Sequence, residues 1–395
     1  MTTVMKKAHV FSDGQFVMGD SSFQTEVPFS LSDALTDASS LYIFPGFCDV
    51  HVHFREPGFS YKETVRTGSM AAAHGGYTTV CTMPNLSPAP DTVAHLALQR
   101  ELIERDAVVA VHPFGTITMG EEGRALSDME AIAPFVCGYT DDGKGVDDIG
   151  LMREAMARAK ALGKVIAAHC EDGTQVKDSP EAEWKEVERD IALAAETGVK
   201  LHICHVSTKE SIALIRDAKK SGIDVTCETA PHYLLLTDGM KEDSGRFRMN
   251  PPLREEADRL ALLTGVLDGT VDMIATDHAP HSHEEKSRGL EGSMMGVVGL
   301  ETAFPVIYTE LVKPGIITLE QAVELLSTRP RARFGIDSDV GFTVFDLGCE
   351  YTVDPEKFLS KGRSTPYKGA RVFGKCLATV YSGRAVYLNE DLIKI

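Results

Sequence analysis

Two histidines, His51 and His53, close an apolar run, and Arg55 follows two residues later. Alternate side chains of an extended strand point to the same side, so both imidazoles face the same way. Paired imidazoles at a strand end are common metal ligands, and a guanidinium beside them can bind a carboxylate. An isolated His-x-His pair is more often a pair of surface histidines. The metal interpretation therefore depends on what the rest of the chain supplies.

Further metal-ligand side chains end four other apolar, strand-like runs of the sequence. These runs end in Asp141-Asp142, His169, His205 and Asp277. If the strands are parallel and close into one barrel, their C-terminal ends meet at one opening. Ligand-type residues at five strand ends favour a metal centre over unrelated surface residues.

The number of ligands predicts two metal ions, because four imidazoles and two carboxylates exceed what one tetrahedral zinc ion uses. One ion would be bound by His51, His53 and Asp277, and the other by His169 and His205. A carboxylate from the fourth strand would bridge the ions. Strand periodicity leaves open whether that carboxylate belongs to Asp141 or Asp142.

Such a centre predicts metal-assisted amide hydrolysis, because zinc lowers the pKa of bound water to about 7. Asp277 would carry the proton from the hydroxide to the leaving nitrogen. Arg55 predicts a substrate with a carboxylate, and Asn85 and His281 are further polar groups at the same opening. Weaker candidates for orienting the ligands are Glu63, Glu171, Glu228, His232 and His278.

From residue 43 onward, strand-like runs alternate with segments of helical period, which is the order of βα units. Eight strands are expected, at residues 43–53, 77–85, 107–118, 135–142, 164–171, 200–207, 224–236 and 271–278. Helices are expected at 62–74, 92–105, 147–162, 182–197, 209–221, 255–267 and 319–329, with a short third crossover near 127–133. This order predicts a closed (βα)8 barrel of the TIM type. A phosphate-binding GxGxxG or GxxxxGK[ST] motif is missing, which argues against an open nucleotide-binding sheet.

The two ends of the chain differ from the barrel region. Residues 1–44 alternate loosely, with a short helix expected near 31–38, and strand-like runs return at 343–347, 376–381 and 385–388. Because chain ends often lie close together, we expect both ends to form one small β-sandwich. The expected domains are residues 1–44 and 336–395 for the β-sandwich and 45–335 for the barrel.

The overall composition excludes several classes of partner. The net charge of −18 argues against binding to nucleic acid or to an anionic membrane. The sequence contains neither a run of about 18 apolar residues nor a signal peptide at its start. The eight cysteines form no CxxC pair, which is typical of buried thiols in a reducing cytoplasm.

Taken together, these motifs resemble the dihydroorotase family of amidohydrolases, in the class with an aspartate bridge. The matching segments are residues 45–58, 76–85, 140–143, 168–172, 204–208, 249–254, 275–281 and 299–304. Two strings, His-x-His-x-Arg-Glu-Pro-Gly and Asp-His-Ala-Pro-His, are specific to this family. The match covers most of the barrel in the right order.

The resemblance implies two Zn²⁺ ions per subunit and reversible closure of N-carbamoyl-L-aspartate to (S)-dihydroorotate, the third step of de novo pyrimidine synthesis. It implies that Asp142, directly before a glycine, is the bridge. Arg55, Asn85 and His281 would hold the substrate carboxylate, Asn250 would contact the ring, and Met295 and Gly296 would offer backbone groups. The family also allows a homodimer and an aspartate transcarbamoylase partner. A departure is Ser-Met-Met-Gly at 293–296, where the family usually has Pro-Phe-Gly.

Two other interpretations compete with this one. Hydantoinases, dihydropyrimidinases and allantoinases share the barrel, but substrates of the first two lack a ring carboxylate, which would leave Arg55 buried and unpaired. They also bridge their metals with a lysine, and only Lys144 lies near the fourth strand end. A non-catalytic homologue that scaffolds aspartate transcarbamoylase would be expected to lose ligands, and every ligand is present here.

Overall fold

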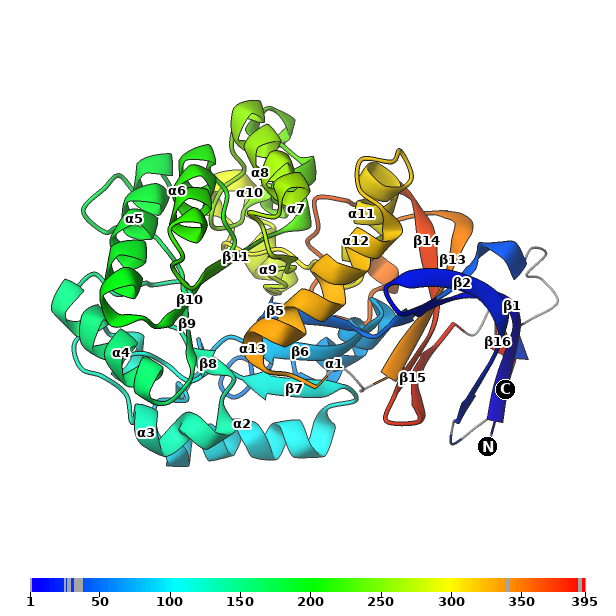
Figure 1. Cartoon of the computed structure of the whole chain (residues 1–395), viewed down its shortest axis with the longest axis horizontal. Coiled ribbons are helices and arrows are strands. Elements are labelled where there is room, and N and C mark those ends of the chain that lie inside the picture. Colours follow the sequence, from blue (N-terminus) through cyan, green and yellow to red (C-terminus); the bar gives the residue numbers. More distant parts are fainter. Residues whose placement is uncertain are drawn as a thin grey trace.

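The computed structural model describes residues 2–24, 26, 30–31, 38–337, 341–389 and 393–394, and Figure 1 shows a barrel beside a β-domain. The barrel strands are β5 (Phe47–Val52), β6 (Tyr77–Thr82), β7 (Ala110–Pro113), β8 (Gly138–Tyr139), β9 (Val165–Ala168), β10 (Lys200–Ile203), β11 (Val225–Thr229) and β12 (Met273–Ile274). One sheet holds β5–β7 and another β8–β12. Parallel bridges from Gly115 to Tyr139 and from Val52 to His278 join the two sheets at both edges. The predicted closed barrel is confirmed.

Helices follow the strands in turn and cover the outside of the barrel (Figure 1). They include α1 (Val65–His74), α2 (Val93–Asp106), α3 (Met129–Ile132), α4 (Ile149–Ala161), α5 (Pro180–Thr197), α6 (Lys209–Lys220) and α8 (Glu256–Asp268). Five of them start at a side-chain oxygen that accepts a bond from an early helix amide. These caps are Thr64, Thr92, Asp148, Ser179 and Thr208. The caps fix where each loop from a strand end becomes helical.

The first expected strand, 43–53, is in fact two strands. β4 (Leu41–Pro45) lies in the β-domain and β5 begins the barrel. Between them, a Cβ atom on Gly46 would lie 2.1 Å from Thr78 Oγ1, so only glycine fits at this crossing.

Several expected boundaries were wrong. The run 224–236 is a strand only to Thr229, and α7 (Pro231–Leu235) follows, because proline suits the first helical position. The last expected helix, 319–329, is α12 (Leu319–Val323), a π-helical turn and α13 (Arg329–Phe334). Three further helices were not expected either: α9 (His283–Lys286), α10 (Gly289–Gly292) and α11 (Ala303–Ile307). Apolar periodicity alone does not separate a short buried strand from a short buried helix.

Both ends of the chain build the β-domain, as predicted. Its main sheet has the order β15 (Arg384–Leu388), β14 (Arg371–Tyr381), β13 (Gly341–Thr352), β4, β1 (Thr2–Ser12) and β2 (Gln15–Gln24). A second pair joins β16 (Ile393–Lys394) to β3 (Ser30–Leu31). The helix expected near 31–38 falls almost wholly outside the described residues.

A cluster of aromatic rings joins the β-domain to the barrel. Phe44 and Phe345 come from the sheet, Phe47 from β5 and Phe304 from α11, and all four are fully buried. Ring centroids lie 5.1 Å apart for Phe44 and Phe304 and 4.4 Å apart for Phe304 and Phe345. Such edge and tilted contacts add to the burial of apolar area, so the sheet is a fixed support for the barrel.

Within the described residues, no helix combines the length and apolar character needed to cross a bilayer. All eight cysteines are free thiols.

Arg331 lies at the N-terminal end of the barrel, where β5 and β6 begin. This α13 residue is 3% exposed. It donates to Thr79 Oγ1 at 2.9 Å, to Thr78 Oγ1 at 3.0 Å and to the Gly46 carbonyl at 3.0 Å. The same guanidinium donates to the Asp337 carbonyl at 2.9 Å. One side chain thus links the last barrel helix to the first two strands.

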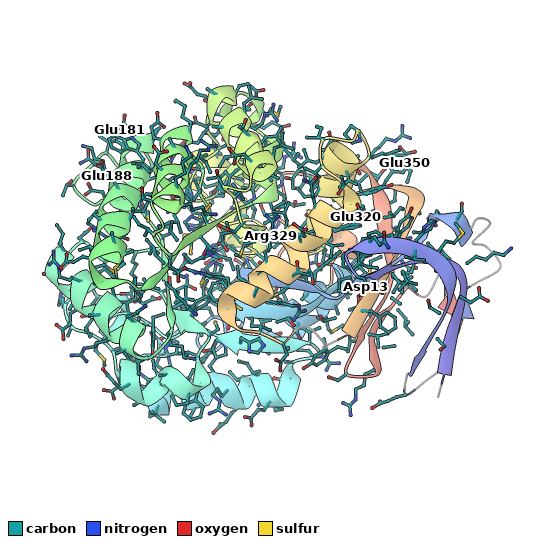
Figure 2. All side chains as sticks on the ribbon, viewed as in Figure 1. Asp13, Glu181, Glu188, Glu320, Arg329 and Glu350 are labelled. Atoms are coloured by element: carbon teal, nitrogen blue, oxygen red, sulfur yellow. The ribbon has the colours of Figure 1, made fainter. Side chains whose placement is uncertain are left out.

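We predict that Arg331→Met lowers the free energy of unfolding by about 3 kcal/mol, because it leaves several buried acceptors without a donor. Arg329→Met is the control, since Arg329 lies on the outside of the same helix (Figure 2) and pairs with Glu324. Denaturant unfolding of both variants checks the prediction. Equal losses of stability in the two variants would contradict it.

Candidate metal centre and active site

The ligand-type side chains predicted from the sequence lie together at the C-terminal opening of the barrel. His51 and His53 stand at the end of β5, and the others follow β8, β9, β10 and β12 as Asp142, His169, His205 and Asp277. Each of the six is at most 6% exposed. Segments far apart in the sequence therefore form one buried cluster of metal-ligand groups.

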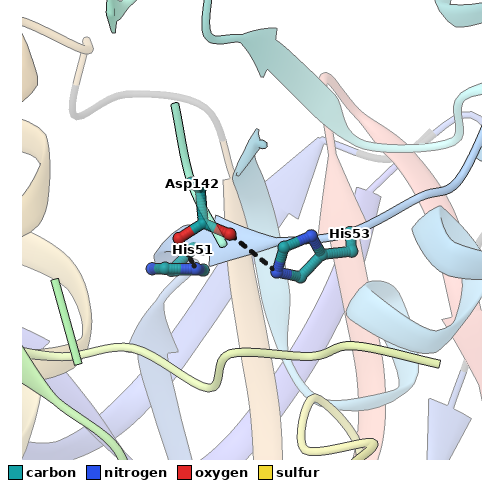
Figure 3. Close-up of side chains that lie close together, drawn as sticks. All are labelled: His51, His53 and Asp142. Atoms are coloured by element: carbon teal, nitrogen blue, oxygen red, sulfur yellow. Dashed lines mark ion pairs between the residues drawn. The ribbon is translucent and has the colours of Figure 1, made fainter. Parts of the chain in front are cut away.

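The Asp142 carboxylate lies between two pairs of imidazoles. Its Oδ1 atom is 3.3 Å from His51 Nε2 and its Oδ2 atom is 3.6 Å from His53 Nε2. Figure 3 shows the three side chains facing one another. On the other side, Oδ1 lies 3.6 Å from both His169 Nδ1 and His205 Nε2. Two groups of three potential ligands share this carboxylate. The arrangement suits a pair of divalent ions with a bridging carboxylate.

Three buried atoms in the cluster have no hydrogen-bond partner among the described residues: His51 Nε2, Asp142 Oδ1 and His169 Nε2. Buried polar atoms are nearly always partnered, so unpartnered ligand atoms facing each other fit a metal ion. Asp277 completes the first group, with Oδ1 at 3.1 Å from His53 Nε2 and 3.6 Å from His51 Nε2.

Asp141 points away from the cluster. Its Oδ1 atom accepts hydrogen bonds from the amides of Ile117 at 2.7 Å and Thr118 at 3.1 Å, and Thr118 Oγ1 donates to its other oxygen. The structure therefore places Asp142, and not Asp141, among the imidazoles. Asp141 instead fastens the segment that follows β7.

The cluster keeps Asp142 ionised. Burial alone raises the pKa of this carboxyl, but the neighbouring imidazoles of His51, His169 and His205 hold its pKa well below the ordinary value. A buried carboxylate in its charged form is a ligand for a cation.

Three of the predicted site residues have left-handed backbone conformations. The φ angles are +60° at Arg55, +34° at His205 and +46° at Asp277. Residues with a Cβ atom rarely adopt these angles, and such strain gathers at functional sites, where the surrounding fold maintains it. No periodicity in the sequence signals these positions.

Glu228, a weak candidate from the sequence, fixes the orientation of His51, a candidate metal ligand. Its Oε1 atom lies 2.6 Å from His51 Nδ1, and its Oε2 atom lies 3.1 Å from His202 Nε2. Nδ1 of His51 donates to this carboxylate, which leaves Nε2 free to face the cluster. The Cys204 thiol is also near, but burial raises its pKa to about 12, so it is protonated and a poor ligand.

Arg55, Asn85 and His281 come together beside the cluster. Arg55 Nη1 lies 3.5 Å from Asn85 Oδ1, and Nη2 lies 3.5 Å from His281 Nε2. Arg55 is 9% exposed, and no carboxylate of the described residues lies within ion-pair distance of it. A buried, unpaired guanidinium is costly, so this corner is suited to an anionic ligand.

His281 is held as a neutral imidazole. Burial, with Arg55 and Lys62 nearby, lowers the pKa of His281 to about 3. Its Nε2–H donates to the Met295 carbonyl at 2.7 Å, and its Nδ1 accepts from Lys62 Nζ at 3.2 Å. The positive charge of this corner therefore comes from the guanidinium and the ammonium.

A cavity of about 350 Å³ opens over the cluster, a size typical of small-molecule sites. Its lining includes Asn250, Met295 and Gly296, together with every predicted metal ligand except His51. Two lysines not selected from the sequence, Lys62 and Lys177, also line it. A larger cavity of about 620 Å³ lies between the end of α1 and strands β13 and β14, but it holds none of the predicted site residues.

Solved structures identify the class of fold. L-Hydantoinase from Arthrobacter aurescens matches with a TM-score of 0.83 and 23% identity over 98% of this chain and 96% of that one. Dihydropyrimidinase from Brevibacillus agri matches with a TM-score of 0.83 and 22% identity over 99% and 96%. Identity this low shows the fold alone, which is a (βα)8 barrel joined to a β-sandwich.

Sequence relatives narrow the class to one family. A family model described as Dihydro-orotase-like matches residues 40–186. Proteins named dihydroorotase are 46% identical in Fusobacterium nucleatum, over 91% of each chain, and 45% identical in Shouchella clausii, over 90% of each. A third, from Ligilactobacillus salivarius, is 42% identical over 99% of this chain and all of its own. This chain belongs to the dihydroorotase family.

We predict that Glu228→Gln weakens metal binding about 10- to 100-fold, because an oriented His51 binds a metal better than a free one. Competition with a chelator measures the change. Glu301→Gln is the matched control, since Glu301 is a buried carboxylate paired with His74 away from the cluster. The same metal affinity in both variants would count against the role of Glu228.

His281 predicts a pH dependence of stability. The pKa of His281 in the folded protein, about 3, lies below the ordinary value of about 6.5. Its contribution to the free energy of unfolding is therefore full above about pH 6.5 and is lost as the pH falls towards 3. Between pH 7.5 and 5, wild-type protein should lose about 2 kcal/mol more stability than His281→Gln. Unfolding curves at both pH values test this, and parallel losses would refute it.

Proposed function

We propose that this chain is a dihydroorotase that interconverts N-carbamoyl-L-aspartate and (S)-dihydroorotate in pyrimidine synthesis. The observation that carries the proposal is the unpaired, buried Arg55 beside a cluster of metal ligands. Both compounds have a carboxylate that would neutralise this guanidinium. Relatives that share more than two fifths of the sequence and are named dihydroorotase support the same reaction.

We propose Zn²⁺ as the metal, with two ions per chain. The ligands would be His51, His53 and Asp277 for one ion, His169 and His205 for the other, and Asp142 for both. Imidazole and carboxylate donors suit zinc, and the shared position of Asp142 supports a pair of ions. Bound zinc would supply a hydroxide at neutral pH and polarise the substrate carbonyl.

The proton transfers fall to Asp277. In hydrolysis, the Asp277 carboxylate accepts a proton from the attacking water and delivers it to the departing ring nitrogen. In ring closure it takes the proton from the carbamoyl nitrogen and returns it to the departing oxygen. The buried carboxylate is held ionised, because His53 and His51 lower its pKa against the effect of burial.

Substrate contacts come from the walls of the cavity. Arg55, Asn85 and His281 would hold the carboxylate, and Asn250 would contact the ring. Backbone groups of Met295 and Gly296 would complete the contacts. All these residues line one cavity, which supports their assignment to a single ligand.

The architecture and surroundings complete the proposal. Residues 45–335 would be the catalytic barrel, and residues 1–44 with 336–395 the β-sandwich. A cytoplasmic location is supported by the eight free thiols. The homodimer and the aspartate transcarbamoylase partner stay predictions.

The direct test is hydrolysis of dihydroorotate, followed by the loss of its ultraviolet absorbance, on protein of known zinc content. Dihydrouracil and allantoin serve as parallel substrates. Turnover of dihydroorotate alone is expected. Turnover of another ring would support a different cyclic amidohydrolase, and inactivity of zinc-loaded protein towards all three would support a scaffolding role.

Two substitutions should separate chemistry from binding. Asp277→Asn is expected to lower kcat by about 10²- to 10⁴-fold, because the proton carrier is lost. Arg55→Met is expected to raise KM about 100-fold, because it removes a charge-assisted contact. Steady-state kinetics with zinc analysis of each variant checks both. If Asp277→Asn and Arg55→Met changed KM and kcat in the same way, the assignment of proton transfer to Asp277 and of substrate binding to Arg55 would be contradicted.

A further inference from the structure

Lys286 lies behind the wall of the cavity and is the last residue of α9. The side chain is buried, with 9% exposed. Its ammonium donates to the Arg248 carbonyl at 3.0 Å and to the Met294 and Gly296 carbonyls at 2.7 Å each. An ammonium has three N–H donors, so all three are used on backbone oxygens.

No carboxylate of the described residues forms an ion pair with this ammonium. The adjacent Glu285 pairs instead with Lys62 at 3.0 Å and accepts the Ser282 amide at 3.0 Å. Burial, with Arg248 nearby, lowers the pKa of Lys286 to about 7. Lysines are rarely buried unless paired, and here three backbone carbonyls take the place of a carboxylate partner.

The three carbonyls belong to two segments that face the cavity. Arg248 stands two residues before Asn250, and Met294 and Gly296 flank Met295. Asn250, Met295 and Gly296 line the cavity. The Gly296 amide also donates to the Arg248 carbonyl at 3.0 Å. The ammonium therefore fastens two cavity walls that are already in contact.

The segment 294–296 is also closely packed on its other side. Gly296 has a φ of +132°, and a Cβ atom there would lie 2.5 Å from the Ala279 carbonyl oxygen. On the same side, the Met295 carbonyl accepts a bond from His281 at 2.7 Å. The segment is thus held by the loop after β12 on one side and by Lys286 on the other.

We propose that Lys286 is a positioning residue that aligns both segments for substrate. Its ammonium sets where the Asn250 side chain and the backbone groups of Met295 and Gly296 meet the ligand. This inference rests on the proposed function. Because Lys286 reaches neither the metal ligands nor Asp277 through any hydrogen bond, its removal should weaken substrate binding and leave the chemical step intact.

The kinetic test compares Lys286→Met with wild type in dihydroorotate hydrolysis. We expect KM to rise about 10- to 100-fold, because small displacements of contact groups have effects of this size. We expect kcat within about threefold of wild type and unchanged zinc content. Lys286→Arg, which keeps the charge and several donors, should recover part of the loss in KM. Lys286→Gln, which keeps two N–H donors, is the milder variant should Lys286→Met not fold.

The matched control is Lys164→Met. Lys164 also donates to a backbone carbonyl, that of Val136, at 2.7 Å, but it lies just before β9, at the other end of the barrel. This variant should keep the wild-type KM. A wild-type KM in Lys286→Met, or a fall in kcat at constant KM, would overturn the proposal.

Hydrogen exchange gives a readout that does not depend on turnover. In ligand-free Lys286→Met, the amides of residues 294–297 should exchange faster than in wild type, while those of β9 and β10 should not change. Unchanged exchange at 294–297 would overturn the positioning role. If wild-type protein does not hydrolyse dihydroorotate, the proposed function fails, and the exchange comparison then decides the role of Lys286 alone.

Discussion

The Asp142 carboxylate between two pairs of imidazoles is the contact on which the rest of the structure depends. It lies 3.3–3.6 Å from four histidine nitrogens, and those histidines come from three different strand ends. Only a closed barrel brings parallel strands so far apart in sequence to one opening. The bridge from Val52 to His278 that closes the barrel is therefore also what brings Asp277 to His51 and His53. An open sheet of the same strands would leave this cluster incomplete.

Around that cluster, the protein fixes its reactive groups by partners that do no chemistry themselves. Glu228 sets the orientation of His51 at 2.6 Å, and Asp141 holds the segment beyond β7. Behind the wall of the cavity, Lys286 donates to three backbone carbonyls. Arg55 contacts Asn85 and His281 but has no carboxylate partner among the described residues, which suits this corner to an anionic ligand. The candidate metal ligands and Arg55 are thus buried side by side, and Glu228, Asp141 and Lys286 hold the groups around them in place.

The barrel and the residues of the candidate metal centre could be predicted from the sequence. Both predictions follow from the spacing of apolar residues in strands and helices. His51 and His53 share a face by strand alternation, and strand ends must meet in a closed barrel. Periodicity could not choose Asp142 over Asp141, because the choice depends on two backbone amides in the segment after β7. The strand expected at 224–236 ends at Thr229, and a helix follows. Sequence alone could not predict this end, because an apolar run has the same pattern in a buried strand and in a buried helix. Lys286 carries no local signal, because its three acceptors meet only in the folded chain.

The central claim is that Asp142 is shared by two metal ions, and anomalous diffraction from crystals of the zinc-loaded protein tests it most directly. Data collected on both sides of the zinc absorption edge would locate each ion without reference to activity. We predict two peaks per chain, one beside His51 and His53 and one beside His169 and His205, each in contact with Asp142. A single peak, or a second peak out of reach of Asp142, would contradict the account.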